Sequence, residues 1–177
     1  MRAIKHITLG LVLSSGLTAI TAQAESKVYH IDPDHTIVNA SWSHFGFSNP
    51  SAIFDNVEGT ITFNENLPEK SSVMVTIPIS DVTTFVDKLD KEFMNDKYFH
   101  VDQYPTATFK SERVEATGDN NYKVYGNLTI KGVTKPLTLT AKLNKMGSHP
   151  MTKKAASLSS SSALIWRYKI GSENRGQ

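Results

Sequence analysis

The sequence predicts a mainly β protein, a closed or nearly closed antiparallel barrel with one short helix. Three observations lead to this fold class: apolar and polar residues alternate in several segments after Tyr29, turn-forming clusters separate these segments, and Thr84 to Phe99 departs from the alternation. A two-residue period is typical of strands with one buried face, and closure of a sheet removes its exposed edges. A β-sandwich is the alternative that this pattern leaves open.

The first 24 residues have the features of a cleaved export signal. Arg2 and Lys5 precede an uncharged run from Ile7 to Ile20, and Ala22-Gln23-Ala24 has the small-x-small pattern of a signal-peptidase site. A transmembrane anchor is the alternative, but the run is too short for a helix to span a hydrocarbon core of ~30 Å. We therefore expect cleavage after Ala24 and a periplasmic location.

Composition excludes several classes of function. The chain has 19 Lys and Arg residues against 17 Asp and Glu residues. Arg2 and Lys5 lie in the predicted leader, so the mature chain is neutral and offers no basic stripe for a nucleic-acid backbone. The sequence contains no cysteine, which excludes disulfides, a thiol nucleophile and a thiolate metal site.

Three segments in the first half of the chain alternate as half-buried strands do. A turn at Pro68-Glu69-Lys70 separates the second segment from the third. Their inward faces consist of Val38, Ala40, Trp42 and His44 in the first, of Val57, Gly59, Ile61 and Phe63 in the second, and of Val73, Val75, Ile77 and Ile79 in the third.

The exception to the alternation is Thr84 to Phe99, where Phe85, Leu89 and Phe93 recur every four residues. This spacing predicts one or two short helical turns, with acids early in the segment and Lys97 late. Tyr98 and Phe99 follow directly. They would form either a hydrophobic lid at the mouth of the barrel or a staple that fixes the helix to it.

The second half of the chain predicts a further strand and a hairpin. The strand runs from Thr106 to Val114, and Gly118-Asp119-Asn120-Asn121 forms the next turn. Lys131-Gly132 is a tight turn between two alternating segments, as expected for an antiparallel hairpin. The inward faces of this hairpin consist of Tyr122, Val124, Gly126, Leu128 and Ile130 in the first segment, and of Leu137, Leu139, Ala141 and Leu143 in the second.

Several short motifs follow one another in a characteristic order. Tyr29-His30-Ile31-Asp32 and His44-Phe45-Gly46 come first, Tyr104-Pro105-Thr106-Ala107-Thr108-Phe109 follows, and Gly126-Asn127-Leu128-Thr129 leads through Lys131-Gly132 into Val133-Thr134-Lys135-Pro136. From Tyr29 to about Leu143 the chain resembles the YceI-like family of bacterial periplasmic polyisoprenoid-binding proteins.

The resemblance implies a lipocalin-like barrel whose apolar tunnel holds an isoprenoid chain, such as that of a polyprenyl phosphate or quinone, or another long-chain amphiphile. It also implies a role in lipid handling or stress response, with no cofactor beyond the bound lipid. Small inward residues, Ala40, Gly59, Gly126 and Ala141, would leave volume for the ligand; an ordinary packed core is the alternative. The expected lipid-binding residues are Val38, Ala40, Trp42, His44, Phe54, Ile61, Phe63, Val75, Ile77, Phe93, Tyr98, Phe99, Phe109, Leu128 and Ile130.

Few residues suggest other chemistry. His44 would either cap the polar end of the ligand or lock two strands together. His35 lies near Asp32 and Asp34, but no further ligand stands at the spacing of one strand face, so no metal is expected. No nucleophile with a base, paired carboxylates or phosphate loop is recognisable, so we expect no catalytic residues. An enzyme acting on an isoprenoid lipid is a weaker alternative.

The tail departs from the family pattern. After Lys154 the chain contains a serine run, Ser157 to Ser162, and ends without a strand period. We predict a signal peptide at 1–24, a lipid-binding barrel at 25–156 and an atypical tail at 157–177 that a frameshift near residue 156 would explain; a natural lineage-specific tail is the alternative. Missing closing strands would leave open edges, which favour homodimers and aggregation, or an incompletely folded chain without activity. Contact with the membrane would be transient.

Overall fold

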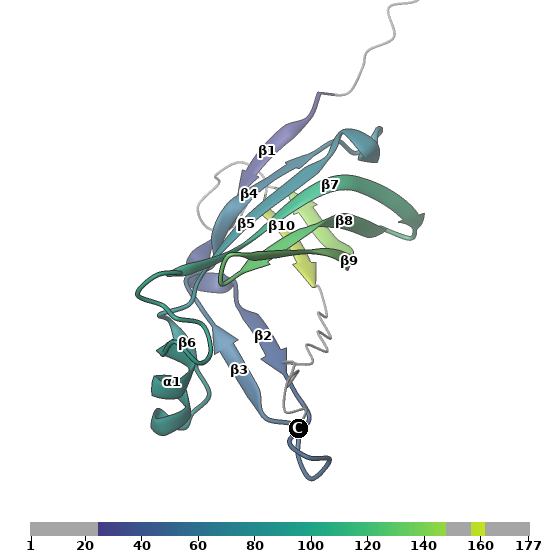
Figure 1. The fold of residues 1–177 in the computed structure, drawn as a ribbon. Coiled ribbons are helices and arrows are strands. Elements are labelled where there is room, and N and C mark those ends of the chain that lie inside the picture. The colour runs from purple at the N-terminus through teal and green to yellow at the C-terminus, as the bar shows by residue number, and fades with distance from the viewer. Residues whose placement is uncertain (1–24, 148–156, 162–177) are drawn as a thin grey trace, which may run out of the picture.

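The computed structural model describes residues 25–147 and 157–161, which form ten strands, one α-helix and two short 3-10 helices (Figure 1). The predicted leader, residues 1–24, lies outside the described residues. Residues 148–156 and 162–177 of the tail also lie outside them.

Most of the described chain belongs to one seven-stranded antiparallel sheet that curls into a half-barrel (Figure 1). Strands β1 and β10 form its two edges, and among the described residues no strand pairs with their outer sides. The predicted antiparallel β fold is confirmed, but the described part of the barrel is open. In sheet order the strands are β1 (Lys27–His30), β4 (Glu58–Phe63), β5 (Ser72–Pro78), β7 (Thr106–Gly118), β8 (Asn121–Ile130), β9 (Val133–Gly147) and β10 (Ser157–Ser161).

A second, smaller sheet lies at one end of the half-barrel together with the helix (Figure 1). Its order is β2 (Val38–Ser41), β3 (Ser51–Phe54) and β6 (Val82–Thr83), and α1 (Asp87–Met94) follows β6. The 3-10 helices are η1 (Pro33–His35) and η2 (Pro68–Lys70). Within the described ranges, no helix combines the length and apolar character needed to cross a membrane.

The turn residues explain the two long hairpins of the larger sheet. Lys131 and Gly132 have φ angles of 50° and 73° between the paired residues Ile130 and Val133. Asp119 and Asn120 have φ angles of 49° and 59° between β7 and β8. Positive φ at both central residues matches the right-handed twist of the strands. The two predicted turns are confirmed.

The helix is shorter than the four-residue spacing predicts. It begins at Asp87, so Phe85 lies before it, with φ of 62° and its ring exposed. The Asp90 carboxylate accepts a hydrogen bond of 2.7 Å from the backbone N–H of Thr84, which holds the preceding segment in a non-helical turn. Leu89 and Phe93 lie within the helix and pack in the apolar core.

The serine run of the tail contributes a strand. Residues Ser157–Ser161 pair with β9 and extend the sheet by one strand, with a register shift between Ser159 and Ser160. Backbone hydrogen bonds do not depend on side-chain polarity, so an available sheet edge can pair with a serine run despite its low complexity. Part of the segment predicted to be atypical therefore continues the fold.

Candidate functional site

One end of the concave side is filled by a cluster of aromatic rings. Phe93 of α1 lies at its centre, with ring centroids 5.6 Å from Trp42, 5.3 Å from Tyr98 and 5.6 Å from Phe99. Phe54 of β3 joins through an edge-to-face contact of 6.0 Å with Phe99. These tilted and edge-to-face arrangements are the favourable ones for aromatic pairs. We call these five residues the Phe93 cluster.

The Phe93 cluster includes many of the residues expected to line a tunnel. Val38, Ala40, Ile77 and Ile130 pack against it. The rings come from the loop after β2, from β3, and from α1 with the segment that follows it, so they converge from several directions. Tyr98 and Phe99 contact Phe93 directly, which is the geometry of a staple between the helix and the half-barrel rather than of a loose lid.

The other end of the concave side holds an open apolar groove. Its cavity volume is about 100 Å³. The lining comes from strands as far apart in the sheet as β4 and β9, which shows that the face curls around the space. Its walls are formed by Ile61, Phe63, Ser71, Val73, Val114, Tyr122, Val124, Leu139, Ala141 and Leu143. We refer to this space as the groove.

Of the residues expected to bind lipid, Ile61 and Phe63 line the groove. Val75, Phe109 and Leu128 pack in the neighbouring cluster together with the groove residue Val124. The predicted list omitted most of the groove wall, although the alternation in β8 and β9 already placed Val124 and Leu139 on the inward face. The two-residue alternation identifies the inward face of each strand, but it does not show which part of that face borders an open cavity.

Two side-chain contacts cross the concave side beside the groove. The rings of Phe63 on β4 and Tyr122 on β8 meet edge to face at 5.6 Å, although β5 and β7 lie between these strands in the sheet. The Tyr29 hydroxyl on β1 lies 3.2 Å from the Met146 sulfur on β9. These contacts bring opposite sides of the half-barrel together without strand pairing.

The groove is shorter than the expected tunnel. Sites for drug-sized ligands usually have volumes of roughly 300–1,000 Å³, whereas the groove has about 100 Å³. The Phe93 cluster fills one end of the concave side, and Phe63 with Tyr122 bridges the other. A continuous tunnel is therefore not present in the described part of the chain, and the groove has room for a short length of hydrocarbon.

The small inward residues have different roles. A Cβ on Gly126 would lie 2.7 Å from Cζ of Phe109 and 2.4 Å from the Lys110 carbonyl oxygen. A Cβ on Gly59 would lie 2.1 Å from the Met74 carbonyl oxygen. The prediction that these two glycines leave volume for a ligand is wrong, because neighbouring groups occupy that volume. Ala141, in contrast, lines the groove.

The groove wall carries no charged side chain among its lining residues, and its polar groups are those of Ser71 and Tyr122. The Ser71 hydroxyl accepts a hydrogen bond of 3.0 Å from the backbone N–H of Asn64. Burial raises the pKa of the Tyr122 phenol above its ordinary value, and the Glu65 carboxylate adds to the shift. Tyr122 therefore stays neutral at physiological pH, and the groove wall carries no charge from its lining side chains.

A larger hollow of about 450 Å³ lies on the outer face of the sheet, beside Met74, Lys110 and Glu112. Four of its polar side chains pair with one another. The Asn127 amide donates to Glu112 at 2.7 Å, and the Thr129 and Thr134 hydroxyls lie 2.8 Å apart. Most of its lining side chains are polar or charged, and Met74 and Phe109 are the apolar ones, so the hollow offers less hydrocarbon wall than the groove does.

The prediction that His44 shares a buried face with Val38 and Trp42 is wrong. Strand β2 ends at Ser41, and the chain then enters a loop in which His44 donates its backbone N–H to the Ser48 carbonyl at 2.9 Å. The His44 side chain is exposed, and its ring lies 4.8 Å from that of Phe45. The break in the strand period after Ser41 moves this residue away from the groove.

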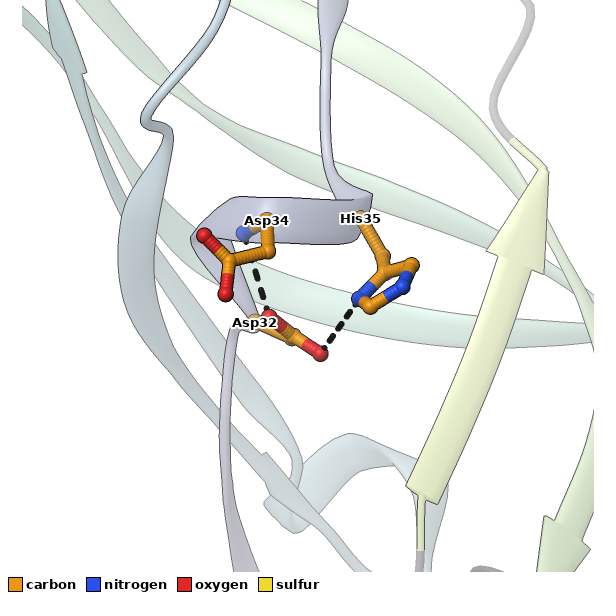
Figure 2. A network of polar contacts seen from close by, with 3 residues as sticks. All are labelled: Asp32, Asp34 and His35. Atoms are coloured by element: carbon orange, nitrogen blue, oxygen red, sulfur yellow. Dashed lines mark hydrogen bonds and ion pairs between the residues drawn. The ribbon is translucent and has the colours of Figure 1, made fainter.

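His35 belongs to a local capping network on η1 (Figure 2). Its Nδ1 lies 2.9 Å from one oxygen of the Asp32 carboxylate, and the other oxygen accepts a hydrogen bond of 3.1 Å from the Asp34 backbone N–H. Asp32 therefore acts as the N-cap of the 3-10 turn. In the described ranges, no three His, Asp or Glu residues are grouped closely enough to hold a metal ion.

Comparisons with known proteins agree with this geometry. The sequence pattern of the YceI-like domain matches residues 29–169, past the predicted boundary at residue 156. Protein YceI of Salmonella arizonae is 38% identical over 154 residues, which cover 86% of this chain and 80% of that protein. A crystal structure of the Campylobacter jejuni YCEI protein superimposes with a TM-score of 0.55 at 30% identity, covering 69% of this chain and 71% of that one.

A second solved structure, Burkholderia cenocepacia BcnA, superimposes with a TM-score of 0.58 at 22% identity. The match covers 63% of this chain and 69% of BcnA. At this identity the likeness concerns the fold alone. About two thirds of the chain thus has a counterpart of known structure.

Proposed function

This chain belongs to the YceI-like family, and we propose that it binds the apolar tail of a polyisoprenoid, a quinone-like lipid or another long-chain amphiphile in the groove. The observation that carries the proposal is the groove wall itself, which is almost wholly apolar and open to the outside. The role is binding and carriage rather than catalysis. We further propose that this role is exercised in the periplasm, in lipid handling or stress response, and membership of the family supports that proposal.

The chemistry of the wall favours hydrocarbon. Each methylene removed from water contributes about 0.8 kcal/mol, so a branched five-carbon unit contributes several times that amount. Aliphatic side chains such as Val73, Val124 and Leu139 supply the contact surface. Affinity would therefore increase with tail length until the tail extends beyond the groove.

A longer tail needs more space than the groove has. The bridge between Phe63 and Tyr122 is the nearest obstacle, since both rings line the groove and touch each other. Separation of these two rings would extend the groove along the concave face. We propose that a long tail binds in this way, with the Phe93 cluster as the fixed closed end.

The proposal is tested by analysis of the lipids that copurify with the chain. The protein is purified without detergent, extracted with organic solvent and analysed by mass spectrometry. Two variants on β9 are compared with the wild type. Ala141→Phe fills the groove, whereas Thr140→Phe adds the same ring at the next residue, which is exposed on the opposite face of the strand.

We expect a long-chain amphiphile in the wild-type extract, a comparable amount with Thr140→Phe, and at least a tenfold reduction with Ala141→Phe. An extract of the wild type without such a lipid would contradict the proposal. Equal lipid content in the two variants would also contradict it, because the lipid would then lie outside the groove.

A further inference from the structure

Three phenylalanine rings are exposed in the loops that leave the smaller sheet. Phe45 and Phe47, in the loop between β2 and β3, are 86% and 91% exposed, and Phe85, between β6 and α1, is 80% exposed. Single apolar residues on a surface are common, but a group of large exposed ones at one end of a molecule marks an interaction site.

The backbone of these loops holds the rings outward. Phe45 and Phe85 have φ angles of 52° and 62°, a region that is unfavourable for bulky side chains. In the first loop the backbone N–H of Phe47 donates to the His44 carbonyl at 3.0 Å, and that of Gly46 donates to the Ser43 hydroxyl at 3.2 Å. The backbone is therefore strained at Phe45 and Phe85, and two hydrogen bonds close the turn that carries Phe45 and Phe47.

The register of the smaller sheet places both loops at the same end. β3 pairs antiparallel with both neighbours. Its Ser51 lies opposite Ser41 of β2, and its Ile53 lies opposite Thr83 of β6. β2 and β6 therefore run in the same direction, so the chain leaves both strands toward one end. In Figure 1 the loop between β2 and β3 projects away from the curled sheet. We call residues 42–50 and 84–86 the phenylalanine end.

Charge and area decide which partner fits this end. Residues 42–50 and 84–86 contain no Asp, Glu, Lys or Arg. An aromatic side chain buries roughly 150–250 Å², so the three rings together offer less than the roughly 800 Å² per partner of a stable protein interface. A bilayer interface accepts separate apolar rings without shape complementarity.

We propose that the phenylalanine end docks reversibly on a lipid bilayer, with Phe45, Phe47 and Phe85 entering the interface. Docking adds to the proposed lipid binding and does not require an occupied groove. It orients the molecule with Trp42 and the rest of the Phe93 cluster toward the membrane. Uncharged loops make this binding independent of anionic lipid.

The experiment measures binding of the purified chain to phosphatidylcholine vesicles by sedimentation, and quenching of Trp42 by brominated phosphatidylcholine in a Trp166→Phe background. We expect wild-type binding and quenching, with less than about a twofold change when a third of the lipid is anionic. The Phe45→Ser/Phe47→Ser variant should bind about tenfold more weakly for each ring removed, as the burial of one such ring implies.

The matched control is Val28→Ser/Met74→Ser, which removes two exposed apolar side chains from the half-barrel and should bind as the wild type does. The groove variant Ala141→Phe should also bind vesicles, so failure of docking and failure of lipid binding are distinguishable. Absence of wild-type binding, or equal weakening in the control, would overturn the proposal. A concentration-dependent dimer that is lost in the Phe45→Ser/Phe47→Ser variant would also overturn it, because the partner would then be a second copy of this chain. Thermal melts check that each variant is folded.

Discussion

The Phe93 cluster and the groove are both apolar and both lie on the concave side, yet only the groove keeps space. In the Phe93 cluster, rings from a loop, from β3 and from α1 converge on one point and fill it. The groove is lined mainly by strand residues, which point inward from a single curved surface. Space persists where no second layer of chain covers the sheet, so the helix end is structural and the groove is available to a ligand.

The largest effect that separates the two regions is expected for Phe93→Ala. Phe93 is buried and contacts three other rings, so its removal should lower the free energy of unfolding by about 3–5 kcal/mol. Urea denaturation measures the change. Phe47→Ala, at an exposed site near the same end, should change stability by no more than about 0.5 kcal/mol. Similar losses in both variants would show that the Phe93 cluster is not a packed core.

A smaller effect is expected for Gly126→Ala, which tests where the filled region ends. The new Cβ would meet the Phe109 ring and the Lys110 carbonyl well inside van der Waals contact, so we expect a loss of about 1–3 kcal/mol. Gly147→Ala is the control, because a Cβ there has open space. If Gly126→Ala were neutral in the same denaturation assay, the volume beside Gly126 would be open after all.

Much of the fold could be predicted from the sequence because strand period and turn chemistry are local. Lys131-Gly132 and Asp119-Asn120 adopt the positive φ angles that these turns need. The start of the helix could not be predicted, because the backbone N–H of Thr84 donates to the Asp90 side chain six residues later, and this side-chain contact competes with the helical position of Phe85. Pairing of the serine run with β9 also depends on an edge elsewhere in the chain.

The site was harder to predict than the fold. Alternation placed Ile61, Phe63 and Ala141 on the inward face, and these residues do line the groove. His44 was misplaced because its strand ends at Ser41. The period of β7 and β8 could not show that the Phe109 ring would occupy the space beside Gly126, since that depends on the approach of two strands. The frameshift stays a prediction.

The smallest expected effect concerns the pH dependence of stability and Tyr122 in the groove. Its pKa is raised in the folded state, by burial first and by Glu65 second. The unfolded chain therefore loses this proton at lower pH than the folded chain, so the stability that Tyr122 contributes below about pH 10 decreases as pH rises above that value. The difference in urea midpoint, wild type minus Tyr122→Phe, should decrease between pH 9 and pH 11. A constant difference would show that the phenol is not desolvated.

The most direct test of the central claim is photo-crosslinking with a long-chain alcohol that carries a diazirine near the end of its tail. Labelled peptides identified by mass spectrometry show which residues the tail contacts. We expect labels on groove residues of β5, β8 and β9, such as Val73, Val124 and Leu139, and loss of these labels in Ala141→Phe. Labels concentrated on α1 and the rest of the Phe93 cluster, with none in the groove, would contradict it.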